Sequence, residues 1–164
     1  MRIVMEMKKR KNIRLENFDY SGYGAYFVTI CAKDRKNLFW AVGASIARPQ
    51  EIALSDIGMI VNQAIQNIPI HYPQVSVDHY VIMPNHIHLL LQIHENHGRA
   101  MLAPTISRVI QQMKGYVSKR VGAGIWQKSF YDEIARNEQD YLSYWNYIEG
   151  NPLKWGEDEY YFEE

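Results

Sequence analysis

Residues 80–91 constrain the fold most strongly, because two stretches rich in apolar residues flank a break at residues 84–85. This composition is typical of two β-strands joined by a turn. Side chains alternate between the faces of a strand, so His86 and His88 would share one face of the second strand. The opposite face would be apolar and would point into a core: Ile87, Leu89 and Leu91. Two imidazoles on one face are enough to begin a metal site, although the spacing alone fits two partly exposed strand residues equally well.

Size and composition set broad limits. The chain has 164 residues, of which 47% are hydrophobic, and we expect one globular domain over residues 1–164. The apolar runs are too short for a membrane span, and the N-terminus lacks the apolar segment of a signal peptide. Cys31 is the only cysteine, which excludes a disulfide framework and a cysteine-ligated zinc cluster. We therefore expect a cytoplasmic protein with no membrane partner.

The charges are distributed unevenly, although the net charge is zero. Five of the 18 acidic residues lie in an acidic tail, residues 157–164, which leaves a net charge of +5 over residues 1–156. Basic residues gather in an N-terminal arm, residues 1–20, and on one predicted helix: Lys8, Lys9, Arg10, Lys11 and Arg14 in the arm, and Arg108, Lys114, Lys119 and Arg120 on the helix. This distribution fits a phosphate-binding surface, and it also fits an ordinary solvated surface with a disordered arm.

Several segments are expected to be extended. They are rich in β-branched and aromatic residues, and they are interrupted by polar or proline-containing turns. We predict strands over residues 26–31, 38–42, 75–83 and 86–93 and an extended segment over residues 125–134. Residues 43–50 show no clear period, and we expect a loop there.

Three helices are expected from apolar residues at a helical spacing. The first covers residues 54–68, with Ser55 as its cap and Pro69 as its end. The second covers residues 104–121, and the third runs from Asn137 to Pro152. The resulting order is strand, helix, strand, strand, helix, strand and a further helix, which predicts an α+β ferredoxin-like sandwich: an antiparallel sheet with helices on one face and an additional C-terminal helix.

Taken together, five segments resemble the single-domain tyrosine transposases of the HUH (His-hydrophobe-His) superfamily, and most closely the REP-associated tyrosine transposases and their insertion-sequence relatives. The similar segments are YFVT at 26–29, MPNHIHL at 83–89, WQKSFYD at 126–132, IARN at 134–137 and YIEGNPLKW at 147–155. They occur in the order found in that family and span most of the chain. The histidine pair alone would be a weak signal, whereas the ordered set is specific.

The resemblance implies a metal site and a nucleophile. It assigns His86 and His88 to a divalent metal, magnesium or manganese, with the Asn151 amide as a further ligand. A tyrosine on the last helix would attack DNA and form a 5′-phosphotyrosine intermediate. Its position four residues before the Asn-Pro pair selects Tyr147 from the competing tyrosines, and on a helix Tyr147 lies about 100° from Ile148, at the flank of the expected apolar stripe.

The resemblance also implies a substrate, which would be single-stranded DNA beside a hairpin. Besides the two basic groups, candidate DNA contacts are Trp126 for base stacking and Lys128 and Arg136 for the backbone. Two other functions stay open from the sequence: a catalytically silent nucleic-acid-binding module, and a metal-dependent hydrolase that uses water. A homodimer is possible, and the roles of residues 43–50 and of the acidic tail are not indicated by the sequence.

Overall fold

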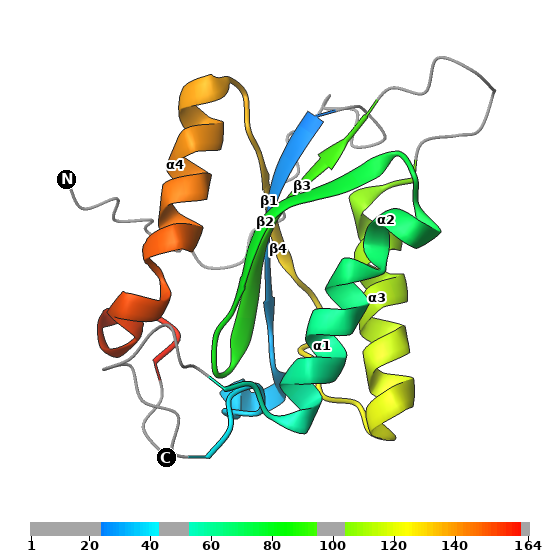
Figure 1. The fold of residues 1–164 in the computed structure, drawn as a ribbon, viewed down its shortest axis with the longest axis vertical. Helices are drawn as coiled ribbons and strands as arrows, with labels where there is room; N and C mark the ends of the chain where they lie inside the picture. Colours follow the sequence, from blue (N-terminus) through cyan, green and yellow to red (C-terminus); the bar gives the residue numbers. More distant parts are fainter. Residues whose placement is uncertain (1–23, 43–52, 95–103, 162–164) are drawn as a thin grey trace.

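A computed structural model describes residues 24–42, 53–94 and 104–161 (Figure 1). The basic arm at residues 1–20, the expected loop at residues 43–50 and the last three residues of the acidic tail lie outside the described residues. Among the described residues, no helix is both long and apolar enough to cross a membrane.

Four strands form one antiparallel sheet: β1 (Gly24–Cys31), β2 (Val75–Ile82), β3 (His86–Ile93) and β4 (Tyr131–Ile134). Their spatial order is β2-β3-β1-β4, and every neighbouring pair is antiparallel. Together with the helices between them, this order confirms the predicted ferredoxin-like α+β fold. The strand that carries the two histidines is therefore central, with a hydrogen-bonded neighbour on each side.

Three helices cover one face of the sheet: α1 (Asp56–Gln66), the short α2 (Ile68–His71) and α3 (Ile106–Val121) (Figure 1). Side-chain oxygens cap both long helices, because Ser55 accepts from the Gly58 amide and Thr105 accepts from the Arg108 amide. Alternate residues of β1 and β3 pack beneath these helices in the main core, among them Tyr26, Val28, Ile87, Leu89 and Leu91.

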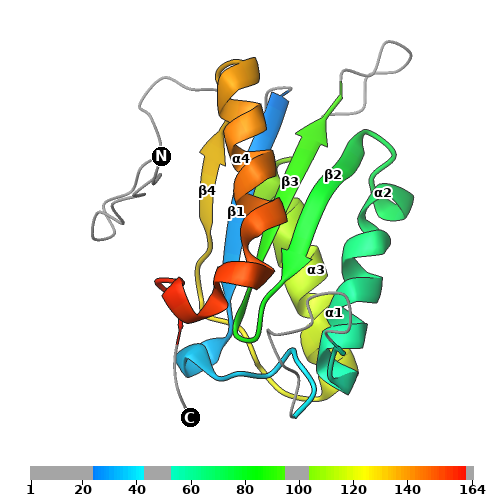
Figure 2. The same cartoon turned by 60° about the vertical axis from the view of Figure 1, so that its left-hand side comes forward.

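The opposite face is covered by α4 (Glu138–Gly150), which lies over the sheet and leads into the 3-10 helix η3 (Pro152–Glu157) (Figure 2). Asn137 caps α4 by accepting from the Asp140 amide, so the helix starts where the sequence predicted. A smaller apolar cluster of Phe27, Leu90 and Ile148 joins α4 to the sheet. The expected stripe on α4 is only partly correct, since Ile148 is fully buried and its other members are half-buried: Tyr141, Tyr144 and Trp145.

Three local predictions were wrong. Residues 38–42 form no strand, because only an isolated bridge joins Trp40 to Leu54, and the 3-10 helix η1 (Lys33–Arg35) precedes them. Pro69 does not end a helix, because α1 ends at Gln66 and Pro69 lies in the first turn of α2, where the missing amide hydrogen costs nothing. The extended segment 125–134 contributes only the four residues of β4 to the sheet, with a single bridge from Trp126 to Ala32 before it.

Candidate metal and nucleophile site

The two histidines open β3 and point toward the α4 side of the sheet. His88 lies opposite Thr29 and His86 lies opposite Cys31 in the register with β1. Both imidazoles are buried, at 0% and 1% exposure, beneath side chains from α4, η3 and the residues that follow. The sheet therefore presents the two rings inside the molecule, and the alternative of two partly exposed strand residues does not hold.

Asn85 determines which nitrogen of His86 is available. Its Nδ2 lies 2.6 Å from the carbonyl oxygen of Tyr160 and 3.3 Å from that of Arg35, and both of these partners are acceptors only. The remaining amide oxygen, Oδ1, therefore faces Nδ1 of His86 at 2.8 Å, and that nitrogen must carry the hydrogen. The lone pair of a neutral His86 then lies on Nε2, the nitrogen that faces His88.

Nε2 of His88 is 3.1 Å from Nε2 of His86, and Nδ1 of His88 is 2.8 Å from the hydroxyl of Thr29. Burial lowers the pKa of His88 to about 3. Burial also lowers the pKa of His86 well below its ordinary value, and the repulsion that a protonated His86 would meet from His88 and Arg35 adds to this. Both rings are therefore neutral at pH 7, which is the form that binds metals. The hydroxyl of Thr29 can donate or accept, so it serves His88 in either tautomer.

Asp158 brings a carboxylate to the two imidazoles. One ligand atom from each of His86, His88 and Asp158 lies within 4.8 Å of the others. The Asp158 side chain is 2% exposed, and burial raises the pKa of its carboxyl group. A spacing of 3.1 Å between the two Nε2 atoms fits neighbouring ligands that each lie about 2.0–2.2 Å from one ion. The donor set of two nitrogens and one oxygen thus fits a divalent metal.

The segment after α4 covers His86. The Tyr160 ring packs on the His86 ring with centroids 4.4 Å apart, and the Trp155 ring lies 5.9 Å from His86. The guanidinium group of Arg35 also lies 5.8 Å from the centroid of the Tyr160 ring. The described part of the acidic tail, residues 157–161, therefore packs against the site. Its acidic composition did not predict this contact.

Tyr147 comes from α4 and contacts His88. Their ring centroids are 5.2 Å apart in an edge-on arrangement, and the Phe27 ring lies 5.8 Å from Tyr147. Burial and then the charges of Asp158 and Glu159 raise the pKa of Tyr147 to about 12, whereas the Asn151 amide lowers it. Asn151 itself is buried beside Tyr147. The protein without metal therefore keeps Tyr147 protonated.

The competing tyrosines are held by carboxylates. The hydroxyls of Tyr131 and Tyr144 both donate to Glu133 on β4, and the hydroxyl of Tyr141 donates to Asp78 on β2. Burial and these carboxylates raise the pKa of all three phenols. Among the tyrosines considered from the sequence, Tyr147 is the one whose ring touches a histidine of the site.

The predicted DNA contacts are spread over the molecule. Arg108, Lys119 and Arg120 are exposed on α3, on the face of the sheet opposite the histidines. Lys114 on the same helix donates to the Gln127 carbonyl, and burial lowers its pKa. Trp126 is buried in the core against Phe39, so its ring is closed to a base. Two further residues are exposed near β4: Lys128 and Arg136.

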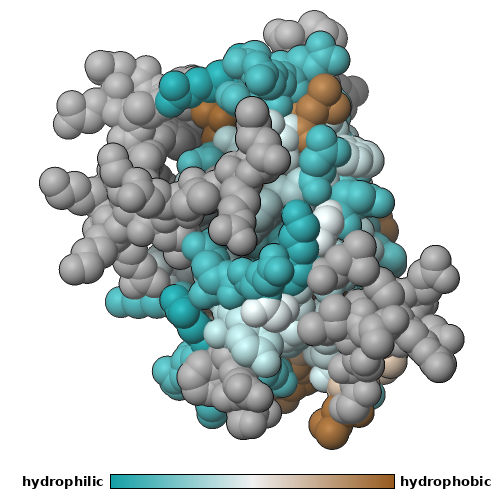
Figure 3. All heavy atoms as spheres, turned by 90° about the vertical axis from the view of Figure 1, so that its left-hand side faces the viewer, coloured by the Kyte–Doolittle hydropathy of each residue, from teal (hydrophilic) through white to brown (hydrophobic). Residues whose placement is uncertain are grey.

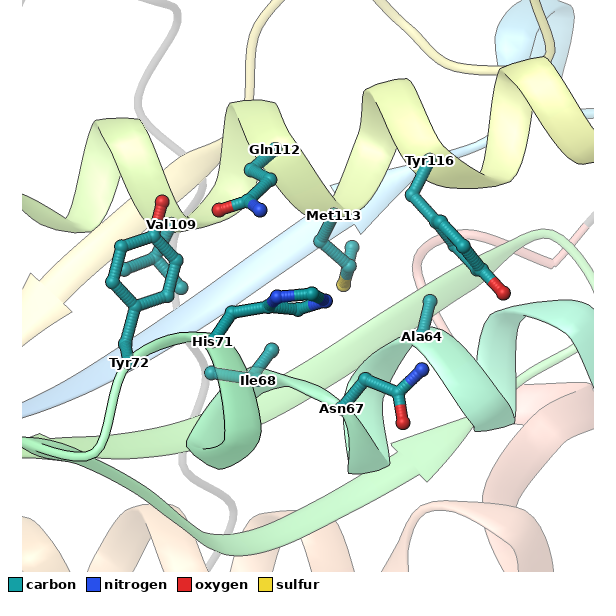
Figure 4. Close-up of a pocket in the computed structure, with 9 residues that line it drawn as sticks. All are labelled: Ala64, Asn67, Ile68, His71, Tyr72, Val109, Gln112, Met113 and Tyr116. Carbon is teal, nitrogen blue, oxygen red and sulfur yellow. The ribbon is translucent and has the colours of Figure 1, made fainter.

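The outer surfaces on the two sides of the sheet differ. Seen from the α4 side, the visible described residues are mainly hydrophilic (Figure 3). On the far face, a small and mainly apolar hollow lies between α2 and α3, where Figure 4 shows His71 and Tyr72 opposite Met113 and Tyr116. His71 is the only imidazole among the residues that line this hollow.

The sequence did not reveal four residues of the site: Thr29, Asn85, Asp158 and Tyr160. Thr29 is found only through the register between β1 and β3, which a strand pattern does not fix across unconnected strands. Asn85 has the composition of an ordinary turn residue. Asp158 and Tyr160 lie 70 or more positions after the histidines in a charge-rich segment, and no spacing rule connects them to β3.

Comparisons with known proteins give a consistent picture, although no protein-family profile matches the chain. A Haemophilus influenzae protein named "Uncharacterized protein" is 34% identical over 172 residues, which is 93% of each chain. Another protein of that organism, named "Putative REP-associated tyrosine transposase", is 29% identical over 147 residues, which is 84% of this chain and 75% of its own length. The fold is shared with a solved REP-associated tyrosine transposase bound to a REP hairpin, with a TM-score of 0.57, 23% identity, and coverage of 80% of this chain and 67% of that one.

Proposed function

We infer that this chain, which is related to the REP-associated tyrosine transposases, is a DNA-processing enzyme. We propose that it cleaves and rejoins single-stranded DNA through Tyr147 with the help of a divalent metal. The observation that carries this proposal is one juxtaposition inside the protein: two neutral imidazoles with Nε2 atoms 3.1 Å apart, and a tyrosine ring 5.2 Å from one of them.

The residues of the site fit a metal, magnesium or manganese. His86 and His88 would hold it through Nε2, with a third donor from Asp158 or Asn151. A bound divalent ion would polarise the phosphate and stabilise the charge that develops on it. The protein's own residues would set the geometry: Asn85 fixes the tautomer of His86, and Thr29 supports the ring of His88.

Tyr147 would act as the nucleophile. Its phenolic oxygen would form a bond to phosphorus and lose its proton, while the bond from phosphorus to the 3′ oxygen breaks and that oxygen takes up a proton. The products are a 5′-phosphotyrosine link and a free 3′-hydroxyl, and attack by a second 3′-hydroxyl reverses the step and rejoins the strand. The raised pKa of Tyr147 means that the phenolate needs nearby positive charge.

The proposed substrate is single-stranded DNA with a hairpin. The solved REP-associated tyrosine transposase that shares this fold is itself bound to a REP hairpin. In this chain, exposed Lys128 and Arg136 flank β4, and the basic arm adds Lys8, Lys9, Arg10, Lys11 and Arg14. The cations of α3 would reach only DNA that passes around the edge of the sheet, since α3 covers the other face.

A denaturing gel tests the proposal. Labelled single-stranded hairpin DNA is mixed with the wild type, Tyr147→Phe or Tyr116→Phe, with manganese or with a chelator. We expect a covalent adduct with the wild type and Tyr116→Phe in manganese, and none with Tyr147→Phe or with chelator. Tyr116 is a matched control because it is exposed on α3, away from the histidines. An adduct that persists in Tyr147→Phe would contradict the assignment of the nucleophile.

A metal-dependent hydrolase is a second candidate, and Asp158 is the observation that favours it. The sequence offered no carboxylate for activating water, but the structure brings the Asp158 carboxylate to within 3.6 Å of Nε2 of His86. The same gel separates the two reactions. Cleavage that continues in Tyr147→Phe without any adduct would indicate water as the nucleophile, whereas binding without cleavage would indicate a silent binding module.

A further inference from the structure

We propose that Asp158 is the third ligand of the metal held by His86 and His88, so that the segment following α4 completes the metal site. This inference rests on the proposed function only in requiring an ion at the two imidazoles. It assigns a role to the described part of the acidic tail, residues 157–161, and it gives the third position to a carboxylate in place of the Asn151 amide.

One oxygen of the Asp158 carboxylate is buried without a partner in the described part of the chain. Its Oδ2 is buried, has no hydrogen-bond partner among the described residues, and lies 3.6 Å from Nε2 of His86. A buried charged oxygen without a partner is costly, and buried carboxylates are normally paired or bound to metals. The neutral His86 faces this oxygen with the lone pair of Nε2, so an ionised Asp158 and His86 have no hydrogen between them. A cation between them would satisfy both.

The local backbone determines where this oxygen points. Oδ1 of Asp158 accepts from the amide of Tyr160 at 2.9 Å, and the carbonyl of Asp158 accepts from the amide of Tyr161 at 3.0 Å. The amide of Asp158 in turn donates to the carbonyl of Trp155 at 3.0 Å. The side chain is therefore part of a tight turn that occupies one carboxylate oxygen and leaves the other directed toward the imidazoles.

Asn85 holds both this turn and the proposed ligand His86 in place. Asn85 donates to the carbonyl of Tyr160 at 2.6 Å and accepts from Nδ1 of His86 at 2.8 Å. The Tyr160 ring lies on the His86 ring, with centroids 4.4 Å apart. Asp158 and His86 are thus held in one hydrogen-bonded unit, which is the kind of support that fixes the ligands of a metal site.

The test is a calorimetric titration of the full-length protein with Mn²⁺. It compares the wild type with four variants: Asp158→Asn, Glu157→Gln, His88→Gln and Asn151→Ala. Asp158→Asn keeps the side-chain shape and removes the charge, and Glu157→Gln makes the same charge change at an exposed neighbour. We expect Asp158→Asn to raise the Kd for Mn²⁺ by at least about 10-fold, and Glu157→Gln to change it less than about twofold. Circular dichroism checks that each variant is folded.

A second readout follows the segment itself. Trypsin cleavage after the exposed Lys154 should slow when Mn²⁺ is added to the wild type, because the metal would fasten residues 155–161 to β3. Asp158→Asn should lose this protection, and Glu157→Gln should keep it. Cleavage that does not respond to Mn²⁺ in the wild type would contradict a ligand in this segment.

The outcomes separate this inference from the proposed function. If His88→Gln loses Mn²⁺ binding and Asp158→Asn binds like the wild type, Asp158 is not a ligand, and the two-histidine site stands. A large loss in Asn151→Ala with no change in Asp158→Asn would give the third position to Asn151. If His88→Gln binds Mn²⁺ like the wild type, the imidazoles hold no metal, and the proposed function fails together with the inference.

Discussion

The buried imidazole of His88 predicts a specific loss of stability in acid. Its pKa is about 3 in the folded protein, because burial opposes the charged form, and about 6.5 in an unfolded chain. Between these two values the unfolded chain binds a proton that the folded protein does not. The free energy of unfolding therefore falls as the pH decreases below about 6.5, and the contribution of His88 is fully present above that pH.

The size of this effect follows from the two pKa values. From pH 7 to pH 5, linkage through His88 alone lowers the free energy of unfolding by about 2 kcal/mol. His86 acts in the same direction, because its pKa is also lowered by burial. Below pH 5 the carboxyl groups of the protein begin to titrate, so the comparison is restricted to the range above it.

The assay is urea unfolding followed by tryptophan fluorescence at several pH values from 7 to 5, with EDTA to remove metal. His88→Gln is the test variant, and His71→Gln is the control because His71 is exposed at the end of α2. We expect the wild type to lose about 2 kcal/mol more than His88→Gln over this range, and His71→Gln to follow the wild type. Equal pH dependence in the wild type and His88→Gln would refute the account of a neutral, buried His88.

Three further substitutions test the packing and the support of the site. In Gly58→Ala, the new Cβ would lie 2.1 Å from the carbonyl oxygen of Phe39, so we expect a loss of about 1–3 kcal/mol in urea unfolding. In Gly115→Ala the Cβ meets no atom within 4 Å, and we expect a gain of about 0.5–1 kcal/mol; a loss there would contradict the described position on α3. Thr29→Val keeps the shape but removes the hydroxyl at Nδ1 of His88, and calorimetry should show Mn²⁺ binding weakened about 10- to 100-fold; unchanged affinity would mean that this contact does not orient the ring.

Much of the fold was predictable because alternation and helical spacing are strong signals in this chain. The hairpin of β2 and β3 and the shared face of His86 and His88 follow from the period of a strand, and the order of elements gave the ferredoxin-like arrangement. The resemblance to REP-associated tyrosine transposases, read from five short segments, is confirmed by a relative of that name.

The positions of the elements in space were harder to predict from the sequence. Helical spacing places Arg108 and Arg120 on one helix, but it does not say which face of the sheet that helix covers, and α3 lies on the face away from the histidines. An aromatic residue near a motif can be core or surface, and Trp126 proved to be core because it packs on Phe39. Propensity also misled at residues 38–42, where an apolar run makes only a single bridge.

Only some residues of the candidate site could be predicted from the sequence. His86, His88 and Tyr147 could be chosen from spacing and resemblance, and the structure places Tyr147 against His88. Asp158 could not be chosen, because a run of acidic residues near a chain end is usually solvated, and its proximity to β3 depends on the path of η3. Asn85 is a turn residue by composition, and its second contact exists only once Tyr160 is in place.

The position of the nucleophile can be measured by mass spectrometry of the covalent adduct with a short DNA hairpin, formed in manganese. Trypsin places Tyr131 in the peptide 129–136 and the tyrosines of α4 in the peptide 137–154, and fragmentation within the second peptide separates Tyr141, Tyr144 and Tyr147. We predict that the nucleotide mass lies on Tyr147 alone. The mass on Tyr131, Tyr141 or Tyr144 would contradict the account, and so would cleaved DNA with no modified tyrosine.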